Sequence, residues 1–390
     1  MLQGWPFTVG AGVALLLLGI LLGRAWILLR FFRRERSRYG DHPHYLLGLN
    51  YLISNQPDLA LVELSKAVRG ETDAVEAYLA LGNLFREKGQ VERAIDIHKS
   101  LLHRPNLTEL GRLQSLFSLG LDFKKAGLID RAERTLREVV KRDPHNLSGW
   151  HCLRKVYEEM GRWDDAAEIQ RKVQSLAGTR DDRMMASLWT ERGRAAWGDG
   201  DLETALANFT TALELDADYA PAHLGAGDCF AERGEIEAAV RHWQEALSDS
   251  PAWATEALSR IAEAGGASDD LALVERACAQ VLERQPHSWR AQLIKSRLHR
   301  RRGDLQQANE ALTLALSERP GSLTVQRELW ESLRDRDVDS SEFNSLLDRV
   351  MKEARLVDPY VCLRCGFKSS EPFARCPHCQ EWNTVAEEQA

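Results

Sequence analysis

The chain has 390 residues, of which 44% are hydrophobic and 28% are charged, and its formal net charge is −7 at pH 7. This composition is typical of a globular protein and excludes an intrinsically disordered one. Single cores stop growing at roughly 250 to 300 residues, so the length predicts two or three domains or one elongated repeat array. The mild acidity argues against a general nucleic-acid-binding protein, which would need a basic stripe.

The N-terminal segment predicts a transmembrane anchor at residues 1–29. Between residues 6 and 29 the only polar side chains are Thr8 and Arg24, which leaves about 24 residues where a bilayer core needs about 20. A secretory signal peptide would carry positive charge before its apolar run, whereas here five arginines follow it in the linker at residues 30–40. By the positive-inside rule, the rest of the chain faces the cytoplasm. The alternative is a buried core helix.

Residues 41–355 carry a pattern that repeats every 34 residues. Gly48 and Ala60 return as Gly82 and Ala94, and further copies follow after short insertions. The pattern predicts two helices in each 34-residue copy. Counted within the copy, glycine at position 8 and alanine at position 20 let the two helices approach closely, and a glycine at position 15 ends the first helix. Aromatic side chains at positions 11 and 24 are expected to fill the space between neighbouring copies.

Six or seven copies are recognisable, with degenerate ones near Arg154 and between Ile261 and Pro286. That number exceeds the roughly three copies that a stable stack needs. We therefore predict an all-α fold, a tetratricopeptide-repeat superhelical solenoid that follows the transmembrane helix. An irregular helical bundle with chance matches is the alternative.

A solenoid of helix pairs has a concave face that binds peptides or protein segments. The candidate groove residues on the first helix of each copy are Asn83, Arg86, Lys124, Lys125, Arg194 and Trp197; the alternative for each charged one is a solvated side chain. The sequence contains no H-E-x-x-H, G-x-S-x-G or phosphate-binding glycine-rich motif. No catalytic residue is therefore predicted, and we expect a protein that is not an enzyme.

The C-terminal residues 356–390 are predicted to bind a metal. Cys362, Cys365, Cys376 and Cys379 form two C-x-x-C pairs that are separated by ten residues. Four such thiolates complete a tetrahedral set of metal ligands. A segment below roughly 40 residues usually needs a metal or disulfides to fold. The predicted cofactor is one divalent ion, iron or zinc, because both suit a four-sulfur site. Two disulfides are the competing interpretation, which a reducing cytoplasm disfavours.

The order of anchor, repeat body and four-cysteine knuckle resembles the lipopolysaccharide assembly protein B (LapB/YciM) family of Gram-negative bacteria. The resemblance covers essentially the whole chain, and it is carried by residues 48–56 (GLNYLISNQ), 79–98 (LALGNLFREKGQVERAIDIH), 126–133 (AGLIDRAE), 362–367 and 376–382. The tail of the family is described as rubredoxin-like, and the four cysteines match its metal ligands one for one. The loop between the two pairs is much shorter than in true rubredoxins, which argues against electron transfer.

The resemblance implies a regulatory adaptor at the inner membrane, with its N-terminus in the periplasm. Family members hold the lipid A deacetylase LpxC and present it to the membrane protease FtsH, and so limit lipopolysaccharide production; an inner-membrane lipopolysaccharide sensor protein opposes them. A homo-oligomer is compatible with this interpretation. Two alternatives stay open: a scaffold that coordinates several lipopolysaccharide assembly enzymes, and an iron tetrathiolate redox protein.

Overall fold

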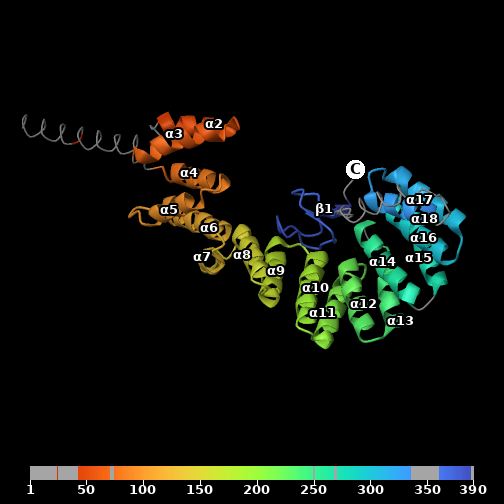
Figure 1. Ribbon diagram of the computed structural model, residues 1–390. Helices are drawn as coiled ribbons and strands as arrows, with labels where there is room; N and C mark the ends of the chain where they lie inside the picture. Colours follow the sequence, from red (N-terminus) through yellow and green to blue (C-terminus); the bar gives the residue numbers. More distant parts are fainter. Residues whose placement is uncertain are drawn as a thin grey trace, which may run out of the picture. The chain divides into compact units, whose positions relative to one another are not determined.

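The computed structural model (Figure 1) describes residues 24, 43–70, 74–248, 251–267, 270–334 and 360–387. The chain divides into two compact units, Met1–Arg162 and Trp163–Ala390. Within the described ranges, no helix combines the length and the apolar composition needed to cross a bilayer. Apart from Arg24, the predicted anchor and the basic linker lie outside the described residues.

The first unit consists of consecutive helices that pack in pairs. Its helices are α2 (Pro43–Ile53), α3 (Pro57–Arg69), α4 (Val75–Glu87), α5 (Val91–Leu102), α6 (Glu109–Lys125), α7 (Ile129–Arg142) and α8 (Leu147–Glu159). Pairs α2/α3, α4/α5 and α6/α7 make the most extensive contacts, and each pair also packs against the next. This is the predicted helix-pair solenoid.

The second unit continues the pattern and ends in a small sheet. Its helices are α9 (Trp163–Ala177), α10 (Asp182–Gly198), α11 (Leu202–Leu215), α12 (Ala220–Glu232), α13 (Ile236–Ala246), α14 (Pro251–Ala267), α15 (Leu271–Arg284), α16 (Trp289–Arg301), α17 (Leu305–Glu318) and α18 (Leu323–Arg334). The strands β1 (Tyr360–Cys362), β2 (Lys368–Ser369) and β3 (Val385–Glu387) form an antiparallel sheet in the order β2-β1-β3.

The boundaries of the helices follow from the side chains at their ends. Asp201 and Asp304 accept a hydrogen bond from the backbone N–H three residues later, which caps α11 and α17 and satisfies one of the donors left open at a helix N-terminus. Gly127 has φ +73° between α6 and α7, a conformation that a glycine adopts without steric cost. The predicted glycine turns are therefore confirmed there.

The two helices of a pair approach closely where the sequence places glycine at position 8. A methyl group added to Gly82, Gly120 or Gly193 would lie within 3 Å of the side chain sixteen residues later, at position 24 of the same copy. Phe209 packs over its own Gly193 and over Gly225 of the following helix pair. The position-24 side chain thus fills space both within its own copy and against the next one.

The copy that was expected to be degenerate after Ile261 is a regular helix pair, α14 and α15. Ile261 replaces the usual glycine and is fully buried, while the residue sixteen positions later is the small Ala277. The large and small positions are thus exchanged, which keeps the total volume of the core. Arg154 occupies the same position in α8, where its guanidinium pairs with the buried Glu158 carboxylate at 2.7 Å.

Candidate metal centre and groove

The four tail cysteines sit on two turns with the same backbone geometry. In the first, the Gly366 N–H donates to the Cys362 carbonyl at 2.8 Å; in the second, the Gln380 N–H donates to the Cys376 carbonyl at 2.9 Å. Gly366 (φ +73°) and Gln380 (φ +60°) both adopt the left-handed conformation. Glycine adopts this conformation without steric cost, whereas sequence reasoning missed Gln380 because a glutamine gives no signal for it.

The four sulfurs converge on one point. All of them lie within 4.8 Å of one another, and the Sγ–Sγ distances Cys362–Cys379 and Cys365–Cys376 are both 3.7 Å. A Zn–S bond of about 2.3 Å places two sulfurs of a tetrahedron about 3.8 Å apart, whereas a disulfide needs about 2.05 Å. The arrangement therefore fits a single tetrahedral ion, and both iron and zinc accept such a set.

Hydrogen-bonding groups around the Cys362 sulfur stabilise its thiolate form. Burial raises the pKa of the Cys362 thiol, but the Thr384 hydroxyl, 3.1 Å from its sulfur, and the amides of Arg364 and Cys365 lower it to about 6. A thiol must lose its proton to bind a metal, so this environment assists loading. Sequence reasoning missed Thr384, because this residue lies outside the C-x-x-C motifs.

The tail has a very small core in which the ligands themselves take part. Cys362, Cys376 and Phe373 are its buried members, and Phe367 packs against them. The His378 ring stacks parallel on Phe367, with 6.4 Å between centroids, and the candidate metal set contains the four cysteines without it. A core of this size does not usually hold a chain folded on its own, so an ion bound by the four cysteines would stabilise the tail.

The tail packs against helices of the second unit. The Tyr219 hydroxyl, at the start of α12, donates to Asn383 Oδ1 at 3.3 Å and accepts from Ser187 Oγ at 2.9 Å. Burial raises the pKa of Tyr219 to about 12, so the hydroxyl keeps its proton. The Arg290 guanidinium lies 4.7 Å from the centroid of the Tyr360 ring, and β3 contacts α14.

Two predicted groove residues of the second unit lie beside this tail. Arg194 and Trp197, both on α10, line a cavity of about 210 Å³ together with Glu371 and Pro372 of the tail. The Arg194 guanidinium also pairs with Glu191 at 2.7 Å. The structure therefore brings these two residues together at a place that the chain's own C-terminal segment partly fills.

Two of the predicted groove residues of the first unit, Asn83 and Arg86, belong to a polar network around the buried Asp122. Arg86 donates to Asp122 Oδ1 at 2.9 Å and to Asn83 Oδ1 at 2.8 Å. The other Asp122 oxygen lies 2.5 Å from His98 Nδ1, and both of these side chains are fully buried. This network joins the second and third helix pairs, so the guanidinium of Arg86 is already engaged within the fold.

The two lysines at the end of α6 differ in their surroundings. Lys124 forms an ion pair with Glu159 of α8, whereas Lys125 is exposed. Of the four predicted groove residues in this unit, Lys125 is thus the one that solvent reaches most freely.

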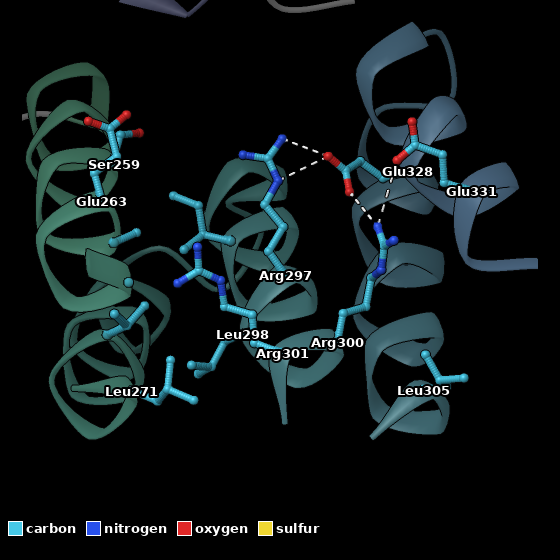
Figure 2. Close-up of a pocket in the computed structure, with 14 residues that line it drawn as sticks. Ser259, Glu263, Leu271, Arg297, Leu298, Arg300, Arg301, Leu305, Glu328 and Glu331 are labelled. Carbon is cyan, nitrogen blue, oxygen red and sulfur yellow. Dashed lines mark hydrogen bonds and ion pairs between the residues drawn. The ribbon is translucent and has the colours of Figure 1, made fainter. Parts of the chain in front are cut away.

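A larger cavity of about 640 Å³ lies between α14, α16 and α18, and no candidate groove residue was predicted there (Figure 2). Arg297 and Arg300 point toward Glu328, which they contact at 2.8 and 3.2 Å. The guanidinium of Arg301 lies against Gly266, where an added methyl group would be 2.2 Å from Nη1. Sequence reasoning missed this cavity because basic residues on a helix are usually just solvated.

The three remaining cysteines lie in helices. Cys229 and Cys278 are buried, and Cys152 is half-buried. Burial raises the pKa of Cys229 to about 11 and that of Cys278 to about 12, so neither thiol ionises near neutral pH. These two side chains pack as small hydrophobic groups.

Comparison with known proteins agrees with this architecture. Residues 360–387 match the family described as rubredoxin metal binding domain, and residues 77–113, 190–257 and 274–322 match tetratricopeptide-repeat families. Lipopolysaccharide assembly protein B of Escherichia coli K12 is 26% identical over 348 residues, which cover 87% of this chain and 88% of that protein. The chain is therefore similar to the lipopolysaccharide assembly protein B family along most of its length. The Haemophilus influenzae member is 24% identical over 355 residues, with the same coverage of both chains.

Solved structures resemble the repeats only loosely. The hetero-tetramer Cut9-Hcn1 of the APC/C matches with a TM-score of 0.33 and 14% identity over 70% of this chain and 52% of that one. A score this low supports no statement about function.

Proposed function

We propose that this chain is a member of the lipopolysaccharide assembly protein B family and acts as an inner-membrane adaptor that limits lipopolysaccharide synthesis. In this proposal it holds the deacetylase LpxC and presents it to the membrane protease FtsH. The observation that carries the proposal is similarity along most of the length to proteins named for lipopolysaccharide assembly, covering 87% of this chain and 88% of theirs. A solenoid of helix pairs supports it because such stacks bind protein segments.

Attachment to the membrane is part of the proposal and rests on the sequence. Residues 1–29 would anchor the chain with the N-terminus in the periplasm, and the repeats at 41–355 and the metal-binding residues 356–390 would lie in the cytoplasm. Tethering an adaptor beside a membrane protease raises the effective concentration of the bound substrate without new contacts. An inner-membrane sensor protein could then regulate the adaptor through the same membrane segment.

The metal centre has a structural role in this proposal. Four thiolates occupy all the coordination positions of a tetrahedral ion, so no open position is left to activate water. This favours a protein that is not an enzyme. The ion would instead fix the two turns and present Leu363, which is 76% exposed between two ligands. A side chain on a rigid turn loses little conformational freedom when it binds a partner protein, so Leu363 is one candidate contact, and Lys125 is a second on the first unit.

The direct cellular test is the half-life of LpxC. Deleting the gene should lengthen that half-life, and the intact chain should restore it, while Cys362→Ser and a chain without residues 1–29 should not. Leu363→Asp, which leaves all four ligands in place, should restore it only in part. An unchanged LpxC half-life in the deletion strain would contradict the proposal.

A broader scaffold for several lipopolysaccharide assembly enzymes is the second candidate, favoured by the word assembly in the names of the relatives. Crosslinking in membranes separates the two candidates. Recovery of LpxC and FtsH alone supports the adaptor, whereas recovery of several biosynthetic enzymes supports the scaffold.

A further inference from the structure

The first helix pair, α2 and α3, exposes more apolar surface than the other described helices. Twelve large hydrophobic side chains of the described residues are exposed, and five of them lie on this pair: Leu46 (57%), Leu47 (39%), Ile53 (86%), Leu59 (47%) and Val62 (47%). We call these five side chains the first-repeat apolar surface. Scattered exposed leucines are ordinary, but a concentration on one element indicates an interaction site.

Position at the start of the stack explains only part of this exposure. The copies of Leu47 in the second and third helix pairs are Leu81 and Leu119, which are only 2% and 5% exposed because a preceding pair covers them. Among the described residues, no helix pair precedes α2. The exposure of Leu47 therefore follows from its place in the chain.

Ile53, Leu59 and Val62 are different, because the next two copies expose the same positions and have charged residues there. The equivalent residues are Glu87, Arg93 and Asp96 in the second pair, and Lys125, Arg131 and Arg134 in the third, and all six are exposed. The fold of a repeat thus requires no apolar side chain at these positions. The first pair has apolar residues where its neighbours have charged ones.

The charges of the same two helices leave this surface free of unpaired acid. Asp58 and Glu63 are the acidic residues of the α2 and α3 ranges. Glu63 lies 2.7 Å from Lys66 Nζ and 2.6 Å from His44 Nδ1, and Asp58 pairs with Lys88. A surface of this kind is not repelled by a negatively charged lipid headgroup.

We propose that the first-repeat apolar surface lies on the cytoplasmic leaflet of the membrane, in contact with phospholipid. This inference rests on the anchor of the proposed function. Leu29 and Pro43 are 14 positions apart, so the chain between them spans at most about 50 Å, which keeps α2 near the bilayer. Arg30, Arg33, Arg34, Arg36 and Arg38 fall in this interval and attract anionic lipid. Apolar side chains enter the boundary between headgroups and acyl chains.

Photocrosslinking in the full-length chain tests this contact. Benzoylphenylalanine placed at position 46 in bacterial membranes should form an adduct with phospholipid, detected by mass spectrometry. The same probe at position 314 is the matched control, because Leu314 is 54% exposed on α17 of the other unit. An adduct with a second copy or with another protein, or a lipid yield no higher than at position 314, would overturn the proposal.

A variant with charged residues in place of three apolar ones supplies a second test of the proposal. Ile53→Glu, Leu59→Arg and Val62→Asp together give the first pair the residues that the second pair has at the same positions, so helix content should be unchanged. The lipid adduct at position 46 should be lost, while the chain stays in the membrane fraction through its anchor. Retention of the adduct would count against the proposal. These readouts do not depend on LpxC, so they separate failure of this inference from failure of the adaptor function.

Discussion

The helical repeats and the C-terminal knuckle are stabilised in different ways. The repeats are stabilised by buried hydrophobic side chains: Leu64, Leu136 and Phe209 are fully buried between helices. In the knuckle, Cys362 and Cys376 are themselves the buried core, together with Phe373. The comparison teaches that removing the metal should unfold one part of the molecule and leave the other intact. Changing a buried side chain in a repeat should instead affect that repeat and the copies packed against it.

The largest expected effect comes from the metal ligands. Cys362→Ser or Cys379→Ser should unfold residues 360–387, because structural zinc sites contribute about 10 to 16 kcal/mol of apparent binding free energy. Hydrogen exchange of the tail should become fast, while far-ultraviolet circular dichroism still reports helical repeats. Cys152→Ser, on α8, is the control. A tail that stays protected after ligand substitution would show that the ion does not hold it.

The buried network of the first unit should give the next largest effect. Asp122→Ala leaves the Arg86 and His98 side chains without their shared carboxylate, and breaking a buried charge pair costs about 3 to 5 kcal/mol. Urea unfolding measures the change, with the exposed Asp96→Ala on α5 as the matched control. Equal stability of the two variants would mean that the network contributes nothing.

Two glycines seven residues apart, Gly120 and Gly127, separate the cost of packing from the cost of backbone strain. Gly120→Ala would place a methyl group 2.8 Å from Leu136, and overpacking costs about 1 to 3 kcal/mol. Gly127→Ala meets no atom within 4 Å but forces alanine to φ +73°, which costs about 1 to 2 kcal/mol.

Leu136→Ala distinguishes the two causes in a double-mutant cycle. It should couple strongly to Gly120→Ala, because it makes room for the added methyl group, and not to Gly127→Ala. Equal coupling energies at the two glycines would show that packing does not explain the first.

The smallest expected effect is a dependence of stability on pH in the second unit. Burial lowers the pKa of His242 from its usual 6.5, and His223 and Arg241 lower it further. The unfolded chain therefore takes up the proton first, so stability is complete above about pH 6.5 and falls as the pH drops toward the folded pKa. His242→Gln should make the fall in melting temperature over this range shallower. An unchanged slope would exclude His242 as its cause.

Regular spacing made the repeats and the ligand set predictable. Gly82 and Gly120 mark close helix contacts because nothing larger fits there, and paired cysteines are tied to their neighbours by short turns. The copy around Ile261 was recognised only as degenerate, because the compensating Ala277 is informative only once the two positions are known to correspond.

Long-range contacts left no comparable signal in the sequence. Tyr219 and Asn383 are 164 residues apart, and no periodicity relates them. The same holds for Arg86 and Asp122, which are 36 residues apart. From the sequence alone, both charged side chains are expected to lie in solvent. Charged residues of the repeats were therefore harder to assign than glycines or cysteines.

The central claim is that this chain binds other macromolecules and presents one to another. The most direct test combines purified full-length protein, FtsH and LpxC in vesicles and measures the rate at which LpxC disappears. We expect the rate to rise with the amount of this protein and to return to the basal value with the Cys362→Ser variant. A rate that does not respond to the protein, or that responds equally to the variant, would contradict the account.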